Sequence, residues 1–75
     1  MNYISGEEIK VGDKVLIEQR RTPGLVEHII ETDQDMKEWG LDEQGLLLLS
    51  EPFGSIFWPL SETYDPVIFV SRGVT

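Results

Sequence analysis

The feature that most constrains the fold of this 75-residue chain is the complete lack of alanine beside seventeen valine, isoleucine and threonine residues. Alanine is the strongest helix former, whereas β-branched residues favour the pleated, half-buried surface of a strand. Seven glycines and four prolines are spread along the chain and divide it into short pieces. The composition therefore predicts an all-β protein with tight connections.

The length allows one domain, residues 1–75, with one small core. Five short strands are predicted, at residues 14–19, 25–31, 46–49, 55–59 and 67–71. Val15 and Ile17 alternate with polar neighbours and point to the core, while Gly12-Asp13 offers a turn before them. These strands predict a five-stranded, SH3-like, partly open barrel with most of its edges hidden.

Turn residues and apolar runs place the other parts of this barrel. Pro23-Gly24 predicts a type II turn between the first two strands, and residues 51–54 predict the next hairpin turn. Residues 46–49 are four leucines, so the third strand is expected to be buried on both sides or to lie at a barrel seam. A short 3₁₀ turn is expected at residues 60–64, before the last strand. The aromatic residues expected in the core or at its seam are Phe53, Phe57, Trp58 and Phe69.

Residues 32–45 follow no two-residue period and are rich in acids. From Glu27 to Glu43 the chain has seven acidic residues and one basic residue, Lys37. We therefore expect a long acidic surface loop here, with one helical turn at residues 35–39. Long loops in compact domains are usually functional or disordered. Trp39 argues against disorder, and it either closes the end of the barrel or serves as an interface anchor.

The charge balance excludes several classes of partner. Fourteen acids against six Lys and Arg give a formal net charge of -8. Affinity for nucleic acid and for anionic membranes depends on basic side chains, so neither partner is expected. The chain lacks an apolar run long enough to cross a bilayer and begins without signal-peptide character. With no cysteine as well, the sequence favours a cytoplasmic protein.

Residues for catalysis or metal binding are sparse. The only histidine, His28, is expected to be a half-buried strand residue with one hydrogen bond, because no nucleophile or orienting partner accompanies it. Zinc needs Cys and His ligands at paired spacing, which one histidine and no cysteine cannot supply. A calcium loop beginning at Asp33 places Glu38 at the turn glycine and Gln44 at the closing glutamate, so only an irregular calcium site stays open. We therefore expect no enzyme activity, no metal and no cofactor; a small hydrolase or other enzyme is the third alternative.

Several short motifs resemble those of a group of short bacterial proteins. They are GEEIKVGDKV at residues 6–15, GLV at 24–26, WGL at 39–41, GLLL at 45–48 and FGSI at 53–56. Some members of that group are encoded beside Rhs-type or other polymorphic toxin genes, which suggests an immunity role. The resemblance spans roughly residues 4–71 and consists of turns and strands. It therefore implies a fold and a class of partner, and no catalytic residues.

Charge and resemblance together predict a non-enzymatic protein-binding module, an immunity protein that occludes a basic toxin domain. Acidic side chains would pair with Lys and Arg of the toxin, and Trp39 would supply the apolar anchor. The alternative is a structural or regulatory adaptor that self-associates through its apolar strands, so both a monomer and a homodimer stay open. The expected partner-binding residues are Glu31, Asp33, Asp35, Glu38, Trp39, Asp42 and Glu43.

Overall fold

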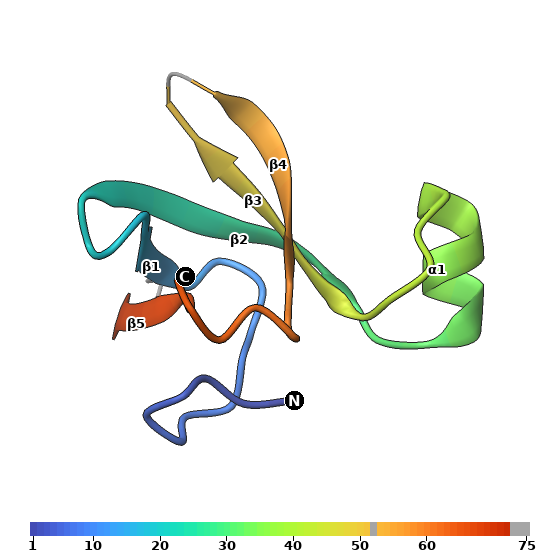
Figure 1. The fold of residues 1–75 in the computed structure, drawn as a ribbon, viewed down its shortest axis with the longest axis horizontal. Helices are drawn as coiled ribbons and strands as arrows, with labels where there is room; N and C mark the ends of the chain where they lie inside the picture. Colours follow the sequence, from blue (N-terminus) through green and yellow to red (C-terminus); the bar gives the residue numbers. More distant parts are fainter. Residues whose placement is uncertain (52, 73–75) are drawn as a thin grey trace.

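Five antiparallel strands and a short helix form the protein (Figure 1). The computed structural model describes residues 1–51 and 53–72. The elements are β1 (Lys14–Ile17), β2 (Thr22–Ile30), α1 (Asp33–Trp39), β3 (Gly45–Ser50), β4 (Gly54–Pro59) and β5 (Ile68–Ser71). They make one sheet in the order β4-β3-β2-β1-β5, in which the last strand returns to pair with the first. The prediction of five strands in a mostly β protein is confirmed.

Among the described residues, no helix has both the length and the apolar character needed to cross a membrane.

The core lies on one face of the sheet and is built from alternate strand residues. Val15 and Ile17 of β1 are buried there, as predicted. Leu46 and Leu48 of β3 join the same cluster, while Leu47 is buried on the opposite face. The expectation that β3 is covered on both sides is therefore right for its first part, but Leu49 is exposed. This alternation is what a period of two dictates for a strand, even when every residue is leucine.

The predicted core aromatics divide into three kinds. Trp58 and Phe69 pack against the core cluster. Phe57 is half-buried and lies over Gly45, where its ring stands close to the glycine backbone. Phe53 is exposed, so its assignment to the core is wrong. It lies between β3 and β4, beyond the end of the covered sheet.

The turn between β1 and β2 lies before Pro23 rather than at it. Glu18, Gln19 and Arg20 have φ values of 55°, 59° and 68°, and the turn is closed by the Arg21 N–H, which donates to the Ile17 carbonyl at 3.0 Å. Pro23 instead pairs with a β1 residue inside the sheet. The type II turn prediction is therefore wrong. Pro23 lies before the part of β2 that pairs with β3, so the strand tolerates the backbone N–H that proline lacks.

Side-chain hydrogen bonds order the connections at this end of the sheet. The Gln19 N–H donates to Asp65 Oδ1 at 2.8 Å, and the Trp58 indole N–H donates to the Asp65 carbonyl at 2.8 Å. Before β5, the Glu62 N–H donates to the Pro59 carbonyl at 3.1 Å, which closes a single turn in the region where one short 3₁₀ turn was expected. In the predicted hairpin turn at residues 51–54, position 52 lies outside the described residues.

A buried carboxylate joins the two ends of the chain. The Asp13 side chain is 0% exposed and accepts hydrogen bonds from the Tyr3 hydroxyl at 2.6 Å and the Lys10 N–H at 2.9 Å. The Arg72 guanidinium donates to it at 3.0 Å and also donates to the Glu8 carbonyl at 2.7 Å. These bonds attach the N-terminal segment and the residue after β5 to the turn before β1. The Gly12-Asp13 turn was predicted from the sequence, whereas the role of the Asp13 carboxylate was not.

This cluster predicts how stability depends on pH. Burial raises the pKa of Asp13, but hydrogen bonds from Tyr3, Lys10 and Arg72 outweigh burial and hold the pKa below its ordinary value of 3.8. Burial, and next the hydrogen bond to Asp13, raise the pKa of Tyr3 above its ordinary value of 10.0. Because the pKa of Asp13 is lowered in the folded chain, the stability that Asp13 contributes is lost as the pH falls below the ordinary value of 3.8. Because the pKa of Tyr3 is raised in the folded chain, the stability that Tyr3 contributes is lost as the pH rises above the ordinary value of 10.0.

We therefore expect the free energy of unfolding to be highest between about pH 5 and pH 9, and to fall on both sides. Urea unfolding followed by tryptophan fluorescence across this range measures it. In Tyr3→Phe the decline above pH 10 should be smaller, because the group that titrates only in the unfolded chain is gone. An equally steep alkaline decline in Tyr3→Phe would contradict this assignment.

Candidate protein-binding surface

The residues singled out for partner binding lie in the connection from β2 to β3, here called the α1 segment (residues 31–45). Its centre is the helix α1, which includes the helical turn expected at residues 35–39 and begins two residues earlier, so the connection is a seven-residue helix with short connections on each side rather than a long loop. None of the helical residues is buried. In Figure 1, α1 lies to one side of the sheet, beyond the end of β2 and the start of β3. The segment is thus displayed rather than packed into the core.

Local hydrogen bonds explain why a helix forms here. Thr32 is the N-cap, and its side chain accepts a hydrogen bond from the Asp35 N–H at 3.1 Å. The Asp35 carboxylate accepts from the Thr32 N–H at 3.1 Å, which completes a capping box. Gly40 ends the helix in the left-handed conformation that glycine adopts most easily. The Thr32-x-x-Asp35 spacing and Gly40 were the sequence signals for this helix.

Some of the predicted acids are engaged with the rest of the fold. Hydrogen bonds from the Thr32 backbone, and then from the Glu31 backbone, hold the pKa of Asp35 below its usual range. Glu43 accepts a hydrogen bond from the Ser61 hydroxyl at 2.8 Å. A carboxylate oxygen of Glu31 lies 3.8 Å from the amino group of Met1. These three acids thus have partners within the chain.

The other three predicted acids are exposed and available. Asp33, Glu38 and Asp42 have no hydrogen bond or ion pair from their side chains within residues 1–51 and 53–72. Asp33 and Glu38 belong to α1, and Asp42 follows it. The seven predicted residues therefore share one segment but divide into acids that hold the segment in place and acids that face solvent.

Trp39 lies on the surface at the end of α1. Its side chain is 47% exposed, and its ring centroid is 4.8 Å from that of His28 on β2, with the two planes tilted by 46°. The ring therefore lies on the surface against His28, and the choice between closing the end of the barrel and anchoring an interface stays a prediction. His28 is exposed, so the expectation of a half-buried histidine is wrong; within the described residues its side chain has the Trp39 ring as a neighbour and no hydrogen bond.

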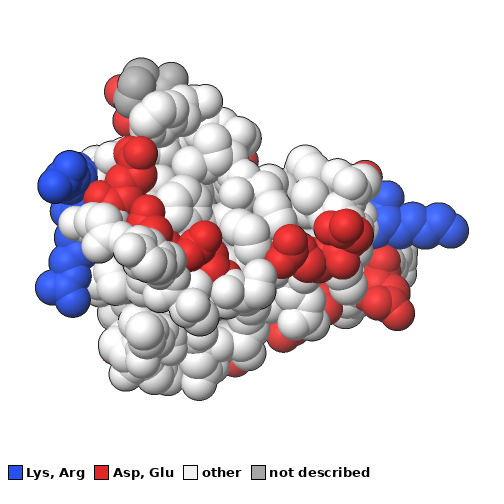
Figure 2. Space-filling view, in the orientation of Figure 1, with Lys and Arg blue, Asp and Glu red and all other residues white. Residues whose placement is uncertain are grey.

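Acidic side chains extend beyond the α1 segment. Figure 2 shows red groups over α1 and a second set over the sheet, with blue groups near both ends of the view. Within the described part of the chain, no group of three or more Asp, Glu or His residues lies in an arrangement suited to holding a metal ion. What distinguishes the α1 segment is therefore its exposed carboxylates next to an exposed indole ring.

Comparisons with models of protein families, with curated proteins and with solved structures each gave no match.

Proposed function

We propose that this chain is a non-enzymatic protein-binding module whose α1 segment engages a basic protein. The observation that carries the proposal is a capped helix that buries none of its residues and places a half-exposed tryptophan beside unpaired carboxylates. A short helix gains most of its stability from packing, so one without buried residues contributes little to folding. Its display is better explained by contact with another molecule.

The scaffold for this helix is inferred to be an SH3-like barrel. The strand order β4-β3-β2-β1-β5, with β5 beside β1, is the order expected of such a barrel. In that arrangement α1 occupies the connection between the second and third strands. A rigid scaffold that carries a variable connection is a common way to present binding residues.

The chemistry of the segment favours a cationic partner. Asp33, Glu38 and Asp42 can pair with Lys or Arg without breaking a hydrogen bond within the described chain, and the net charge of -8 attracts such a partner from a distance. Trp39 supplies apolar area that slows dissociation, while the charges mainly raise the association rate. The resemblance to immunity proteins makes a cytoplasmic basic toxin domain the proposed partner.

Neutralising the exposed acids tests this function against the protein product of the adjacent gene. The triple variant Asp33→Asn, Glu38→Gln, Asp42→Asn should bind that product at least about tenfold more weakly, because each lost charge pair reduces attraction. The matched control removes the same number of charges elsewhere: Glu7→Gln, Glu8→Gln, Glu51→Gln. Calorimetric titration measures both, and equal affinity of the two triple variants would overturn the role of the α1 segment. Absence of binding by the wild-type chain would overturn the toxin partner.

A second candidate function is self-association as an adaptor. Leu25 of β2 and Leu49 of β3 are direct neighbours in the sheet and are 37% and 44% exposed. Such a pair on the face opposite the core offers apolar area to a second copy. Light scattering of the wild-type chain and Leu49→Glu tests it: a dimer lost in the variant supports the candidate, and a wild-type monomer rejects it.

A further inference from the structure

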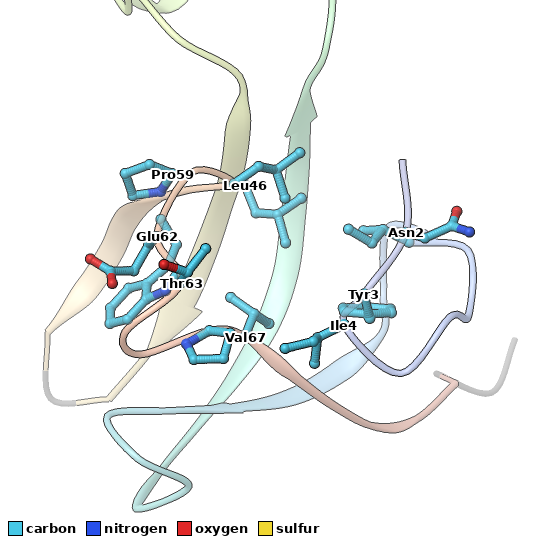
Figure 3. Close-up of a pocket in the computed structure, with 12 residues that line it drawn as sticks. Asn2, Tyr3, Ile4, Leu46, Pro59, Glu62, Thr63 and Val67 are labelled. Carbon is cyan, nitrogen blue, oxygen red and sulfur yellow. The ribbon is translucent and has the colours of Figure 1, made fainter.

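A pocket of about 220 Å³ opens between the N-terminal segment and the connection from β4 to β5 (Figure 3). In the close-up, Pro59, Glu62 and Thr63 stand on one side and Asn2, Tyr3 and Ile4 on the other, with Leu46 and Val67 between them. Leu46 and Val67 belong to the core cluster, so the inner wall of the pocket is the edge of the core itself. The pocket is therefore framed by ordered parts of the fold.

The lining is apolar and has little free hydrogen-bonding capacity. Ile9, Trp58, Leu60 and Pro66 complete the wall. The Tyr3 hydroxyl and the Trp58 indole N–H both donate elsewhere, to Asp13 and to the Asp65 carbonyl. A cavity of about 150 Å³ lined by aliphatic and aromatic residues accommodates benzene. By that measure this pocket accommodates a single phenylalanine or leucine side chain.

The charged side chain that lines the pocket is acidic, and within the described part of the chain no Lys or Arg belongs to the lining. Glu62 is part of the lining, and its Oε1 accepts hydrogen bonds from the N–H groups of Tyr64 and Asp65. Glu43 is held against the same connection by the Ser61 hydroxyl. An apolar group that enters here therefore meets negative charge at the mouth, which favours a group with positive neighbours.

The pocket lies next to the end of the α1 segment. The Leu60 N–H donates to the Gln44 carbonyl at 3.1 Å, which joins the pocket wall to the end of that segment. On the other side, Met1 lies next to the lining residue Asn2, and its amino group is 3.8 Å from Glu31. One wall of the pocket thus contacts the segment that carries the exposed acids, and the residue that precedes the other wall lies close to it.

We propose that this pocket receives an apolar side chain flanked by Lys or Arg on the basic partner protein, and so provides the main anchor of the complex. The inference rests on the proposed function and adds the position and chemistry of the anchor. Trp39 then covers the rim of the interface, while the pocket buries the inserted side chain. Anchors of this kind, enclosed and shielded from water, dominate the affinity of protein interfaces.

Three capped tripeptides serve as probes for the wild-type chain: lysine–phenylalanine–lysine, glutamate–phenylalanine–glutamate and lysine–alanine–lysine. Shifts of backbone amide resonances at Ile4, Leu46 and Val67 report binding. The first peptide should give saturable shifts, the second should bind at least about tenfold more weakly, and the third should give none that saturate. Failure of the first peptide to saturate, or equal affinity for the first two, would overturn the proposal. Saturation by the alanine peptide would also overturn it, because charge alone would then explain binding.

Variants separate this pocket from the rest of the surface. Thr63→Trp fills the pocket from its exposed rim and should abolish the shifts caused by the first peptide. Glu62→Gln should weaken that peptide several-fold, whereas Glu51→Gln, which removes an equal charge from the distant hairpin, should not. Binding of the peptide to Thr63→Trp as tightly as to wild type would overturn the assignment. The peptide series on the wild-type chain decides the matter should Thr63→Trp fail to fold.

The basic partner distinguishes the two proposals. If Thr63→Trp binds the partner like wild type while the α1 triple variant loses affinity, the pocket proposal fails and the proposed function stands. If Thr63→Trp loses affinity and the α1 triple variant does not, the anchor is supported and the role of the exposed acids fails.

Discussion

Asp13→Ala should lower the free energy of unfolding by about 3 kcal/mol, the largest loss expected from any single substitution discussed for this chain. The carboxylate is 0% exposed and accepts from Tyr3, Lys10 and Arg72. Its removal leaves the buried Tyr3 hydroxyl and the Lys10 N–H without their acceptor. Arg72 is 43% exposed and can regain water, which keeps the cost below that of a fully buried ion pair.

Urea unfolding followed by tryptophan fluorescence measures this loss. A domain of this size has a stability near the lower end of the usual 5–15 kcal/mol, so a cost of about 3 kcal/mol removes much of it. Asp33→Ala is the matched control, because that carboxylate is exposed and has no partner within the described residues; its effect should stay within about 0.5 kcal/mol. Equal unfolding midpoints for Asp13→Ala and Asp33→Ala would show that the buried carboxylate does not join the ends of the fold.

Gly45→Ala should cost about 2–3 kcal/mol, because the space for a methyl group is already occupied. A Cβ atom at this position would lie 2.5 Å from the Trp58 carbonyl oxygen and 2.6 Å from atoms of the Phe57 ring. The oxygen belongs to the backbone of β4, the strand paired with β3, so relief requires the two strands to separate. The ring alone could turn, but the carbonyl is fixed by the sheet.

Gly24→Ala is the control for this substitution. The nearest atom to a Cβ there would be Val15 Cγ2 at 3.5 Å, which is ordinary van der Waals contact. Replacing glycine by alanine in an unstrained strand also restricts the unfolded chain, so Gly24→Ala should be neutral or stabilise by up to about 1 kcal/mol. Thermal unfolding of the two variants compares them directly. A Gly45→Ala protein as stable as Gly24→Ala would contradict the close approach of β3 and β4.

Strand periodicity predicted the sheet because it reports burial directly. The alternation around Val15 and Ile17 needs a covered face for these two residues, and the core cluster provides it. Turn chemistry was less informative at Pro23, since proline suits both a turn and the start of a strand that has a neighbour on one side only. The actual turn has Glu18, Gln19 and Arg20 in left-handed conformations, which these residue types rarely adopt and therefore do not predict. A hydrogen bond from the Gln19 N–H to Asp65, which is distant in sequence, helps to hold this turn.

The candidate site was predicted only in outline, because its details also depend on contacts between residues that are distant in sequence. A cluster of acids is visible in sequence, but which of them are free depends on contacts with Ser61 and Met1 that no local pattern contains. The full length of the helix could have been predicted from the sequence, because Thr32 and Asp35 have the spacing of a capping box. The pocket could not be predicted in this way, since its walls come from the N-terminal segment, β3, β4 and the connection to β5.

Hydrogen–deuterium exchange of the chain with and without its basic partner tests most directly where that partner binds. We expect slower exchange at residues 33–44 and 60–63, which belong to the α1 segment and the adjoining pocket wall. The turn at residues 18–21, which lies outside the proposed surface, should exchange equally in both states. Protection centred on that turn, with the α1 segment unchanged, would contradict the claim that the displayed acidic helix is the binding surface.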